Sequence, residues 1–598
     1  MVKPLTRIYG LLSFRKLETA RLRLQELLFR ADLRQDVSFL VVAGIVGVCA
    51  GYGAVVFRGS IDLVQSVMFG TLAKVSAGAG WGLYLIPLLP AFGGLLLGWF
   101  THRFSREARG HGVPDVMKAV IVNDGRIHPM MVVNKIVASA VSIGSGGGGG
   151  REGPIVQIGA AIGSALGQVF RLSTERMRLL VGCGAAGGIA AIFNAPLGGV
   201  MFAIEIILGE FSVRAFSPIV ISSVLATAVS RSILGNNPTF ESPAYTLSSN
   251  VELIFYFVIG VCAGPVSVWF TRTVYWCEDR FTAWKTIPTY LKPMVGGLMT
   301  GILLIWWPGL SGFSYDSINN AIAGNEELFV LAGVFLLKPL AAGLTLGSGG
   351  SGGVFTPALK TGAMMGALIG VAFHSLFPDQ VPGFGGYALV GMGALVAGTM
   401  HAPLTAILML FEVTNSYQII LPIMIAAITA TVIARRYLPQ SVYTIALERE
   451  GVRVGYGVNL NVIQNVRVRD VMRRVPAKLK ESQTLRSVVA TIGKNGHTVL
   501  PVVDEGGGFR GVVTFTDISA VVSDQHASDF LLVKDIMQEE VLTLEEGSSL
   551  EDALKAFELS DLDIIPVVKA RGTRTFVGMV SHESVLNRYR KDILTSRE

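Results

Sequence analysis

Three glycine-bearing turns, each followed by a proline, have the residue types best suited to binding a small ligand. They are Gly110–Pro114, Gly150–Pro154 and Gly352–Pro357. Glycine lets the backbone approach a ligand closely, and proline suits the first turn of a helix. The free N–H groups of a helix N-terminus carry partial positive charge, which holds an anion less tightly than a full charge would. One such turn is usually an ordinary helix cap, but three of them, two inside apolar stretches, favour an anion pathway.

Glu152 lies in the second of these turns, within an apolar stretch of the sequence. A carboxylate at membrane depth is costly and is usually functional. At a helix N-terminus it could occupy the place of the anion, swing out or take up a proton. We therefore predict a gating role for Glu152, with a plain capping carboxylate as the alternative.

Other uses of the glycine-rich run are weakly supported. It contains a G-x-G-x-x-G match at Gly144, Gly146 and Gly149, but the soluble strand–turn–helix context of a dinucleotide site is missing. No Gly-Lys-Ser/Thr follows, which excludes a P-loop. The nearby histidine, serine and glutamate are not spaced as a catalytic triad, so no enzyme is predicted.

Metal and nucleic-acid chemistry are also disfavoured. The carboxylates Glu152, Glu205 and Glu412 are scattered rather than clustered as oxygen ligands, so a metal-ion transporter is a remote alternative and no metal site is predicted. The four cysteines occur singly in apolar surroundings. The net charge of +7 comes largely from basic residues in the first 35 positions and in loops, which fits cytoplasmic segments better than nucleic-acid binding.

The elements that position the three turns are apolar segments typical of a membrane protein. Hydrophobic residues make up 51% of the 598, and charged residues only 16%, whereas a soluble domain has about 25% charged residues. Twelve apolar segments lie between residues 38 and 436, and several are shorter than the roughly 20 residues that a simple spanning helix needs. Irregular backbone at membrane depth requires burial in protein or contact with water, so the breaks indicate a substrate site.

The apolar region is predicted to contain an internal duplication. GREGPIV, with Pro154, has a counterpart in GGVFTPAL, with Pro357, and the two prolines are 203 residues apart. NAPLGGVMFAIE, with Pro196, pairs with HAPLTAILMLFE, with Pro403, at an offset of 207. The sequence leaves open whether the halves are inverted.

Residues 464–598 form a polar tail that is also repeated. VRDVM matches VKDIM, and the segment around Pro501 matches that around Pro566, both pairs at a spacing of 65 residues. Each unit is predicted to contain helix, strand, strand and helix around an apolar core.

The motifs GHGVP, GREGP, GGVFTP, NAPLGGVMFAIE, HAPLTAILMLFEVTN and PQSVYTIAL resemble the CLC family of chloride channels and proton-coupled chloride exchangers, over about residues 38–447. The tail resembles a pair of CBS domains. The resemblance implies an all-α polytopic membrane domain with an inverted internal repeat and broken helices, followed by an α+β CBS pair. The implied segments are 1–36 (cytoplasmic), 37–447 (transmembrane), 448–465 (linker), 466–525 (first CBS domain) and 530–592 (second CBS domain).

The resemblance also assigns roles to individual residues. Glu152 matches the gating glutamate, and Glu205 and Glu210 are candidates for a proton path. The implied anion-binding residues are His111, Gly112, Arg151, Gly153, Val354, Phe355 and Tyr443. It further implies a homodimer with one pore per subunit, surrounded by lipid in the cell or inner membrane, with both termini in the cytoplasm.

Two departures from the family pattern affect the predicted function. His111 replaces the central serine, which leaves nitrate or another anion open as the cargo. Ile206 replaces a second, internal glutamate that coupled exchangers often carry, although some manage without it. The leading prediction is therefore a passive, glutamate-gated chloride channel of the voltage-gated type, and the alternative is a chloride/proton antiporter.

The first tail unit is similar to CBS domains that bind an adenosine ribose. Thr514, Thr516 and Asp517 fit that pattern, whereas the second unit has Ser584 where the aspartate should be. Chloride is thus the predicted transported ligand, and an adenine nucleotide at the CBS pair is a weaker prediction. A purely structural or dimerising tail is the alternative.

Overall fold

The computed structural model describes residues 35–76, 82–209, 211–236, 240, 252–381, 383–452, 466–474, 478–485, 488, 499–522, 531–560, 562–570, 575–585 and 587–588. Residues 1–34 of the predicted lead 1–36, most of the linker 448–465, and Glu210 lie outside these described residues. The chain divides into two compact units, Met1–Val454 and Gly455–Glu598.

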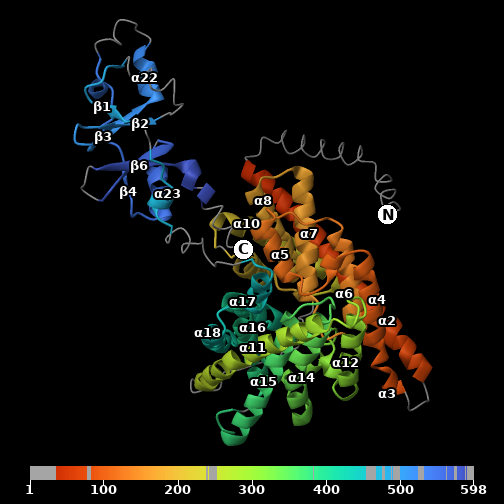
Figure 1. Ribbon diagram of the computed structural model, residues 1–598. Helices are drawn as coiled ribbons and strands as arrows, with labels where there is room; N and C mark the ends of the chain where they lie inside the picture. Colours follow the sequence, from red (N-terminus) through yellow and green to blue (C-terminus); the bar gives the residue numbers. More distant parts are fainter. Residues whose placement is uncertain are drawn as a thin grey trace. The chain divides into compact units, whose positions relative to one another are not determined.

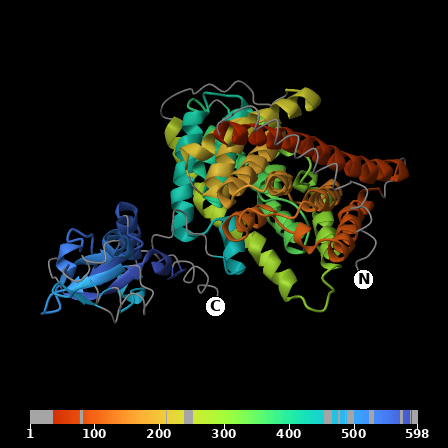
Figure 2. The ribbon, with the colours of Figure 1, turned by 90° about the horizontal axis from the view of Figure 1, so that it is seen from above.

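The regular elements in the described part of the first unit are all helices, and eight of the described helices are long and apolar enough to cross a membrane (Figure 1). Its helices are α2 (Gln35–Ser76), α3 (Gly82–Leu85), α4 (Leu88–Arg103), η2 (Arg106–Ala108), α5 (Val113–Val122), α6 (Met131–Gly144), α7 (Glu152–Phe170), α8 (Thr174–Phe193), α9 (Pro196–Phe202), the π-helix η3 (Ala203–Leu208), α10 (Val213–Leu234), α11 (Glu252–Ala283), α12 (Lys292–Trp306), η4 (Pro308–Leu310), α13 (Asp316–Ala323), α14 (Leu328–Gly347), α15 (Phe355–Leu376), α16 (Gly385–Met400), α17 (Pro403–Thr414), α18 (Ile420–Tyr437) and α19 (Val442–Arg449). Figure 2 shows this unit from above, with α2 as a long helix along one side. The predicted all-α membrane fold with short, broken helices is confirmed.

The internal repeat is visible in how helices pack. A Cβ added at Gly159 of α7 would lie 2.0 Å from the carbonyl oxygen of Gly184 in α8. A Cβ added at Gly184 would lie 2.0 Å from the carbonyl oxygen of Gly159. Gly362 of α15 and Gly391 of α16 approach each other in the same way, at 2.4 and 2.3 Å. Small residues let membrane helices approach this closely. Gly159 and Gly362 are 203 residues apart, and Gly184 and Gly391 are 207 residues apart. These are the offsets of the repeated prolines.

Helices α9 and α17 show that the two halves are inverted. The Glu412 carboxylate, near the end of α17, accepts hydrogen bonds from the N–H groups of Leu197 and Gly198 at the start of α9, at 2.9 and 2.7 Å. The Glu205 carboxylate, just after α9, accepts from the N–H and hydroxyl of Thr405 at the start of α17, at 2.7 and 2.6 Å. The helices therefore lie antiparallel, and each repeat caps the other.

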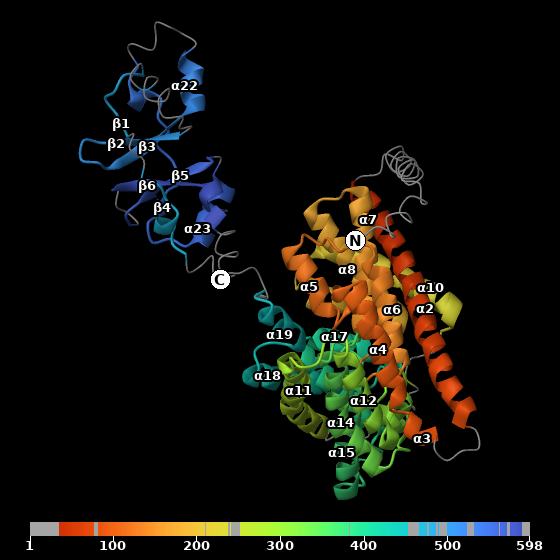
Figure 3. The same ribbon diagram turned by 45° about the vertical axis from the view of Figure 1, so that its right-hand side comes forward.

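The second unit contains two similar three-stranded sheets, β1-β2-β3 and β4-β5-β6 (Figure 3). In each sheet the first strand pairs parallel with the second, and the second pairs antiparallel with the third. The elements are η5 (Val468–Asp470), β1 (Leu479–Lys480), β2 (Val499–Val503), β3 (Phe509–Thr514), α22 (Phe515–Val522), η7 (Val533–Asp535), β4 (Leu544–Glu545), α23 (Leu550–Leu559), β5 (Ile564–Val568) and β6 (Phe576–Ser581). The predicted tail repeat is confirmed, whereas the short leading strands β1 and β4 were not predicted.

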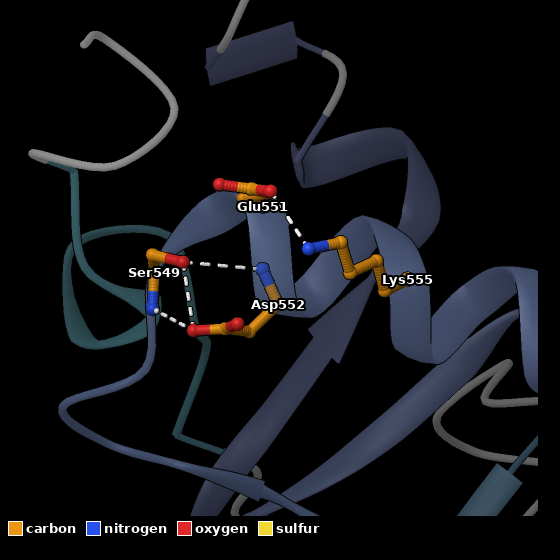
Figure 4. A network of polar contacts seen from close by, with 4 residues as sticks. All are labelled: Ser549, Glu551, Asp552 and Lys555. Carbon is orange, nitrogen blue, oxygen red and sulfur yellow. Dashed lines mark hydrogen bonds and ion pairs between the residues drawn. The ribbon is translucent and has the colours of Figure 1, made fainter. Parts of the chain in front are cut away.

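Helix α23 begins with a reciprocal cap (Figure 4). The Ser549 hydroxyl accepts from the Asp552 N–H at 3.1 Å, and the Asp552 carboxylate accepts from the Ser549 N–H and hydroxyl at 3.1 and 2.7 Å. Glu551 and Lys555 pair one turn apart on the same helix, at 2.7 Å. This capping box satisfies N–H groups that have no partner within the helix.

Candidate functional site

The three glycine-bearing turns singled out from the sequence meet in the first unit. The Gly110 N–H donates to the Gly350 carbonyl at 2.9 Å, and the Gly352 N–H donates to the Gly110 carbonyl at 3.3 Å. Gly150 and Gly353 exchange N–H to carbonyl hydrogen bonds at 2.8 and 2.7 Å. Residues more than 200 positions apart in the sequence thus form one meeting point at the starts of α5, α7 and α15.

Glycine is required where α5 and α7 begin. Gly112 has a φ of +81°, a left-handed conformation that favours glycine. A Cβ added there would lie 2.7 Å from the Gly153 carbonyl oxygen, and a Cβ added at Gly153 would lie 2.0 Å from the His111 carbonyl oxygen. The close approach leaves backbone atoms, rather than side chains, at this part of the site.

Glu152 is fully buried, and its carboxylate lies on the N-terminus of α15. One oxygen accepts from the Thr356 N–H at 2.9 Å, and the other accepts from the Thr356 hydroxyl at 2.7 Å. The carboxylate therefore occupies hydrogen-bond donors that suit an anion. Thr356 was missed in the sequence analysis, although it stands in the GGVFTP motif.

Val354 and Phe355 are also buried at the start of α15. Val354 immediately precedes the helix, and Phe355 is its first residue. N–H groups in a first helical turn have no partner within the helix. The Phe355 ring packs against Phe193, with ring centroids 5.5 Å apart.

Tyr443 is buried near the start of α19, where Ser441 and Thr444 form a capping box. Its hydroxyl faces the Met400 sulfur at 3.7 Å, which is a weak contact. A buried hydroxyl with so poor a partner is suited to donating to a ligand.

His111 belongs to the glycine turn before α5 and lines a polar cavity. Its ring is 6.3 Å from that of Tyr275, and the Tyr275 hydroxyl donates to the Val442 carbonyl beside Tyr443. His111 Nδ1 is buried and has no hydrogen-bond partner among the described residues. His111 and Gly112 line a cavity of about 510 Å³. Its charged lining residues are Glu107, Arg109, Asp115, Lys118, Glu278, Arg449 and Glu450.

The Arg151 side chain is held by Tyr315. The Arg151 Nε donates to the Tyr315 hydroxyl at 3.2 Å, and the guanidinium carbon lies 4.6 Å from the centre of the Tyr315 ring. Phe240 packs against the same ring at 5.1 Å. The side chain of Arg151 is thus tied to an aromatic pair at the N-terminus of α7.

Two buried lysines, 203 residues apart, were also missed. Lys135 Nζ donates to the Ala108 and Gly110 carbonyls, both at 3.2 Å. Lys338 Nζ donates to the Gly148 carbonyl at 3.0 Å and to the Leu310 carbonyl at 2.6 Å. In a trans peptide the N–H points opposite to the C=O. The N–H groups of His111 and Gly149, which follow the bonded carbonyls of Gly110 and Gly148, therefore point away from the lysines.

Of the candidates for a proton path, Glu205 lies in the π-helix η3 with both oxygens on the start of α17. Its neighbour Ile206 is buried. Glu205 is therefore a helix-capping carboxylate, and its role in proton movement stays a prediction.

In the tail, Asp517 is held by its own repeat and by the other one. Its carboxylate accepts from the Thr514 N–H and hydroxyl at 2.8 and 2.7 Å, and from Gln538 Nε2 at 3.0 Å. Thr516 is exposed, and Ser584 makes the matching capping contacts with Ser581. A ribose would have to share Asp517 with these donors.

The chain matches the sequence model described as "Voltage gated chloride channel" over residues 93–435, and the CBS domain model over residues 468–524 and 533–591. It is 36% identical over 417 residues to "Putative chloride channel protein ClcB-like" of Ralstonia nicotianae, covering 69% of this chain and 96% of that protein. It is 32% identical over 425 residues to "H(+)/Cl(-) exchange transporter ClcA" of Vibrio parahaemolyticus, covering 69% and 90%. A solved slow cyanobacterial Cl⁻/H⁺ antiporter superposes with a TM-score of 0.64 and 28% identity, covering 70% of this chain and 98% of that chain.

The prediction of a passive, glutamate-gated channel is wrong, because these relatives include proteins named as exchange transporters and a solved antiporter. The prediction depended on Ile206, which cannot carry a proton. An apolar residue at one position removes one proton carrier only. Other titratable groups, including Asp115, Glu278 and Glu450, line the cavity that reaches His111.

Proposed function

The chain belongs to the voltage-gated chloride channel (CLC) family and carries two CBS domains, and we propose that it is a chloride/proton antiporter. The observation that carries the proposal is the buried Glu152 carboxylate, which holds two donors of Thr356 at the start of α15. The names of its relatives support exchange rather than passive flow.

The proposed exchange depends on one set of donors serving two occupants. Charged Glu152 fills the donors at the start of α15, and protonation weakens its hold because charge-assisted hydrogen bonds are about twice as strong as neutral ones. Chloride then takes the N–H groups of Val354, Phe355 and Thr356, while the neutral carboxyl leaves with its proton. Since carboxylate and chloride exclude each other, movement of one ion drives movement of the other in the opposite direction.

The remaining residues have supporting roles in this proposal. The Tyr443 hydroxyl supplies a donor from α19, and His111 Nδ1 faces the anion from the α5 turn. Arg151, Gly112 and Gly153 shape the approach to the carboxylate. The charged cavity beside His111 gives protons and anions access, with Glu205 as a further proton-path candidate.

Liposomes containing the purified protein test the exchange when chloride efflux and proton uptake are recorded together. The wild type should move protons uphill when a chloride gradient drives it. Glu152→Gln should lose proton movement while chloride flux persists, because the amide cannot carry a proton. Glu412→Gln is the matched control, a carboxylate at the start of α9 rather than α15, and should keep both fluxes. Chloride flux without proton movement in the wild type would refute antiport.

The proposal includes a homodimer with one pore per subunit in the cell or inner membrane, with both ends of the chain in the cytoplasm. The family supports this arrangement, and light scattering of the detergent-purified protein tests the dimer. An adenine nucleotide at Thr514, Thr516 and Asp517 stays a prediction. Calorimetry of the full-length protein with ATP, ADP and AMP tests it, and a lack of heat with all three would leave the tail as a scaffold.

A further inference from the structure

Thr356 gives Glu152 two hydrogen bonds of different origin. The N–H group, 2.9 Å from one carboxylate oxygen, belongs to the main chain and would be present with any residue except proline. The hydroxyl, 2.7 Å from the other oxygen, belongs to the side chain alone. Both side chains are fully buried, so water does not compete for this contact.

The Thr356 hydroxyl differs in direction from those of most buried threonines in this unit, a distinction that it shares with Thr405, whose hydroxyl donates to Glu205 of the other repeat at 2.6 Å. Threonines inside helices commonly bond the carbonyl four residues earlier, and Thr361, in the next turn of α15, does so to Pro357 at 2.8 Å. Buried threonines with the same local bond are Thr101, Thr227, Thr271, Thr300, Thr345, Thr399, Thr414 and Thr431. Thr356 instead donates across to Glu152 in the other repeat.

We propose that the Thr356 hydroxyl is a latch that holds the charged Glu152 in the place of the anion, and so sets how readily chloride displaces it. This inference deepens the proposed exchange and rests on it. Thr356 is a positioning residue, because its side chain acts through Glu152. An O–H group bonded to a carboxylate is a charge-assisted donor, and its 2.7 Å length is typical of a strong one.

The latch has a measurable effect on chloride binding. Hydrogen bonds to charged groups are worth enough that losing one weakens a contact by roughly ten- to a hundredfold. Carboxylate and chloride compete for the same N–H groups at the start of α15, so a weaker hold on Glu152 raises the apparent affinity for chloride. Removing the hydroxyl should therefore tighten chloride binding by about tenfold when Glu152 is charged.

Calorimetric titration of the full-length protein with chloride at neutral pH tests the latch. Thr356→Val removes the hydroxyl at nearly constant volume and should tighten binding, and Thr356→Ser keeps the hydroxyl and should bind as the wild type does. Thr361→Val removes a buried hydroxyl one turn along the same helix and is the matched control. In a Glu152→Ala background, Thr356→Val should leave the chloride affinity unchanged, because the partner of the latch is gone.

Two results would overturn the latch. One is a Thr356→Val protein with the chloride affinity of the wild type. The other is a loss of affinity that persists in the Glu152→Ala background, which would make the hydroxyl a direct anion ligand. Thr356→Ala replaces the valine variant if the latter does not elute as a single species. Failure of antiport is read separately, because a wild type that moves no protons in liposomes refutes the exchange whatever the chloride titration gives.

Discussion

The close contact between α7 and α8 leads to a prediction that separates packing from helix propensity. In Gly159→Ala, the new Cβ would lie 2.0 Å from the Gly184 carbonyl oxygen, whereas ordinary contact begins at 3.4 Å. The obstacle is backbone, so no side chain can rotate out of the way. The two helices must separate by more than an ångström, which moves the helix that begins with Glu152.

The expected loss of stability is the difference between two opposing effects. Alanine gains about 1 kcal/mol over glycine inside a helix, whereas overpacking a tight interface costs about 1–3 kcal/mol. A backbone clash belongs at the upper end of that range, because membrane helices associate through close packing rather than through a hydrophobic drive. The net loss should therefore be about 1–2 kcal/mol.

The assay is the fraction of detergent-purified protein that stays monodisperse after heating. Gly159→Ala should lose its peak at a lower temperature than the wild type, and Gly362→Ala, its repeat mate in α15, should behave likewise. Gly59→Ala is the matched control, because it also lies in a long helix but nothing beyond the neighbouring backbone of that helix lies within 4 Å of the added Cβ. If Gly159→Ala tolerates heat as well as Gly59→Ala, the close approach of α7 and α8 contributes nothing to stability.

Three further outcomes follow from named contacts. Tyr443→Phe should weaken chloride binding in calorimetry yet leave heat tolerance nearly unchanged, because among the described residues the hydroxyl has only the Met400 sulfur as a partner; a clear loss of heat tolerance would contradict this. Glu412→Ala should lower the free energy of unfolding by about 1.5–3 kcal/mol, the usual contribution of hydrogen bonds to a charged group, and so reduce heat tolerance. A variant as heat-tolerant as the wild type would show that α9 needs no cap. Ser549→Ala should speed hydrogen exchange in α23 of the full-length protein, since losing such a cap costs about 0.5–2 kcal/mol. The Ser549 hydroxyl and N–H hold the pKa of Asp552 below its usual range, so this contribution is present above about pH 4 and is lost as the pH falls through the lowered pKa; an effect that grows in acid would contradict the assignment.

The repeat and the meeting of the glycine turns could be predicted because glycine and proline mark positions where the backbone tolerates few alternatives. The 203-residue offset of Pro154 and Pro357 applies equally to Gly159 and Gly362, which pack against neighbouring helices in the same way. The Thr356 latch was not predictable in this manner. A threonine near a helix start has several possible partners, and only the fold brings Glu152 of the other repeat to its hydroxyl.

The tail likewise contains strands that could be predicted from the sequence and strands that could not. Strands β2 and β5 could be predicted from their β-branched runs around Pro501 and Pro566. Strands β1 and β4 have two residues each, which is too short to show the alternation that identifies a strand. Their existence depends on parallel pairing with β2 and β5 rather than on their own residues.

Three carboxylates in this unit lie on the N-terminus of a helix from the other repeat, and symmetry distinguishes one of them. Glu205 and Glu412 are repeat mates: Glu412 caps α9, which precedes Glu205, and Glu205 caps α17, which contains Glu412, so both helix starts are occupied. The repeat mate of Glu152 is Phe355. Its uncharged side chain cannot accept hydrogen bonds from the start of a helix in the first repeat. Glu152 is thus an unreciprocated cap at the meeting point of the glycine turns, and in the proposed exchange a chloride ion would replace it without leaving a second helix uncapped. This asymmetry distinguishes the contact at α15 from those at α9 and α17, and under the proposed exchange it is what allows Glu152 to act as a gate.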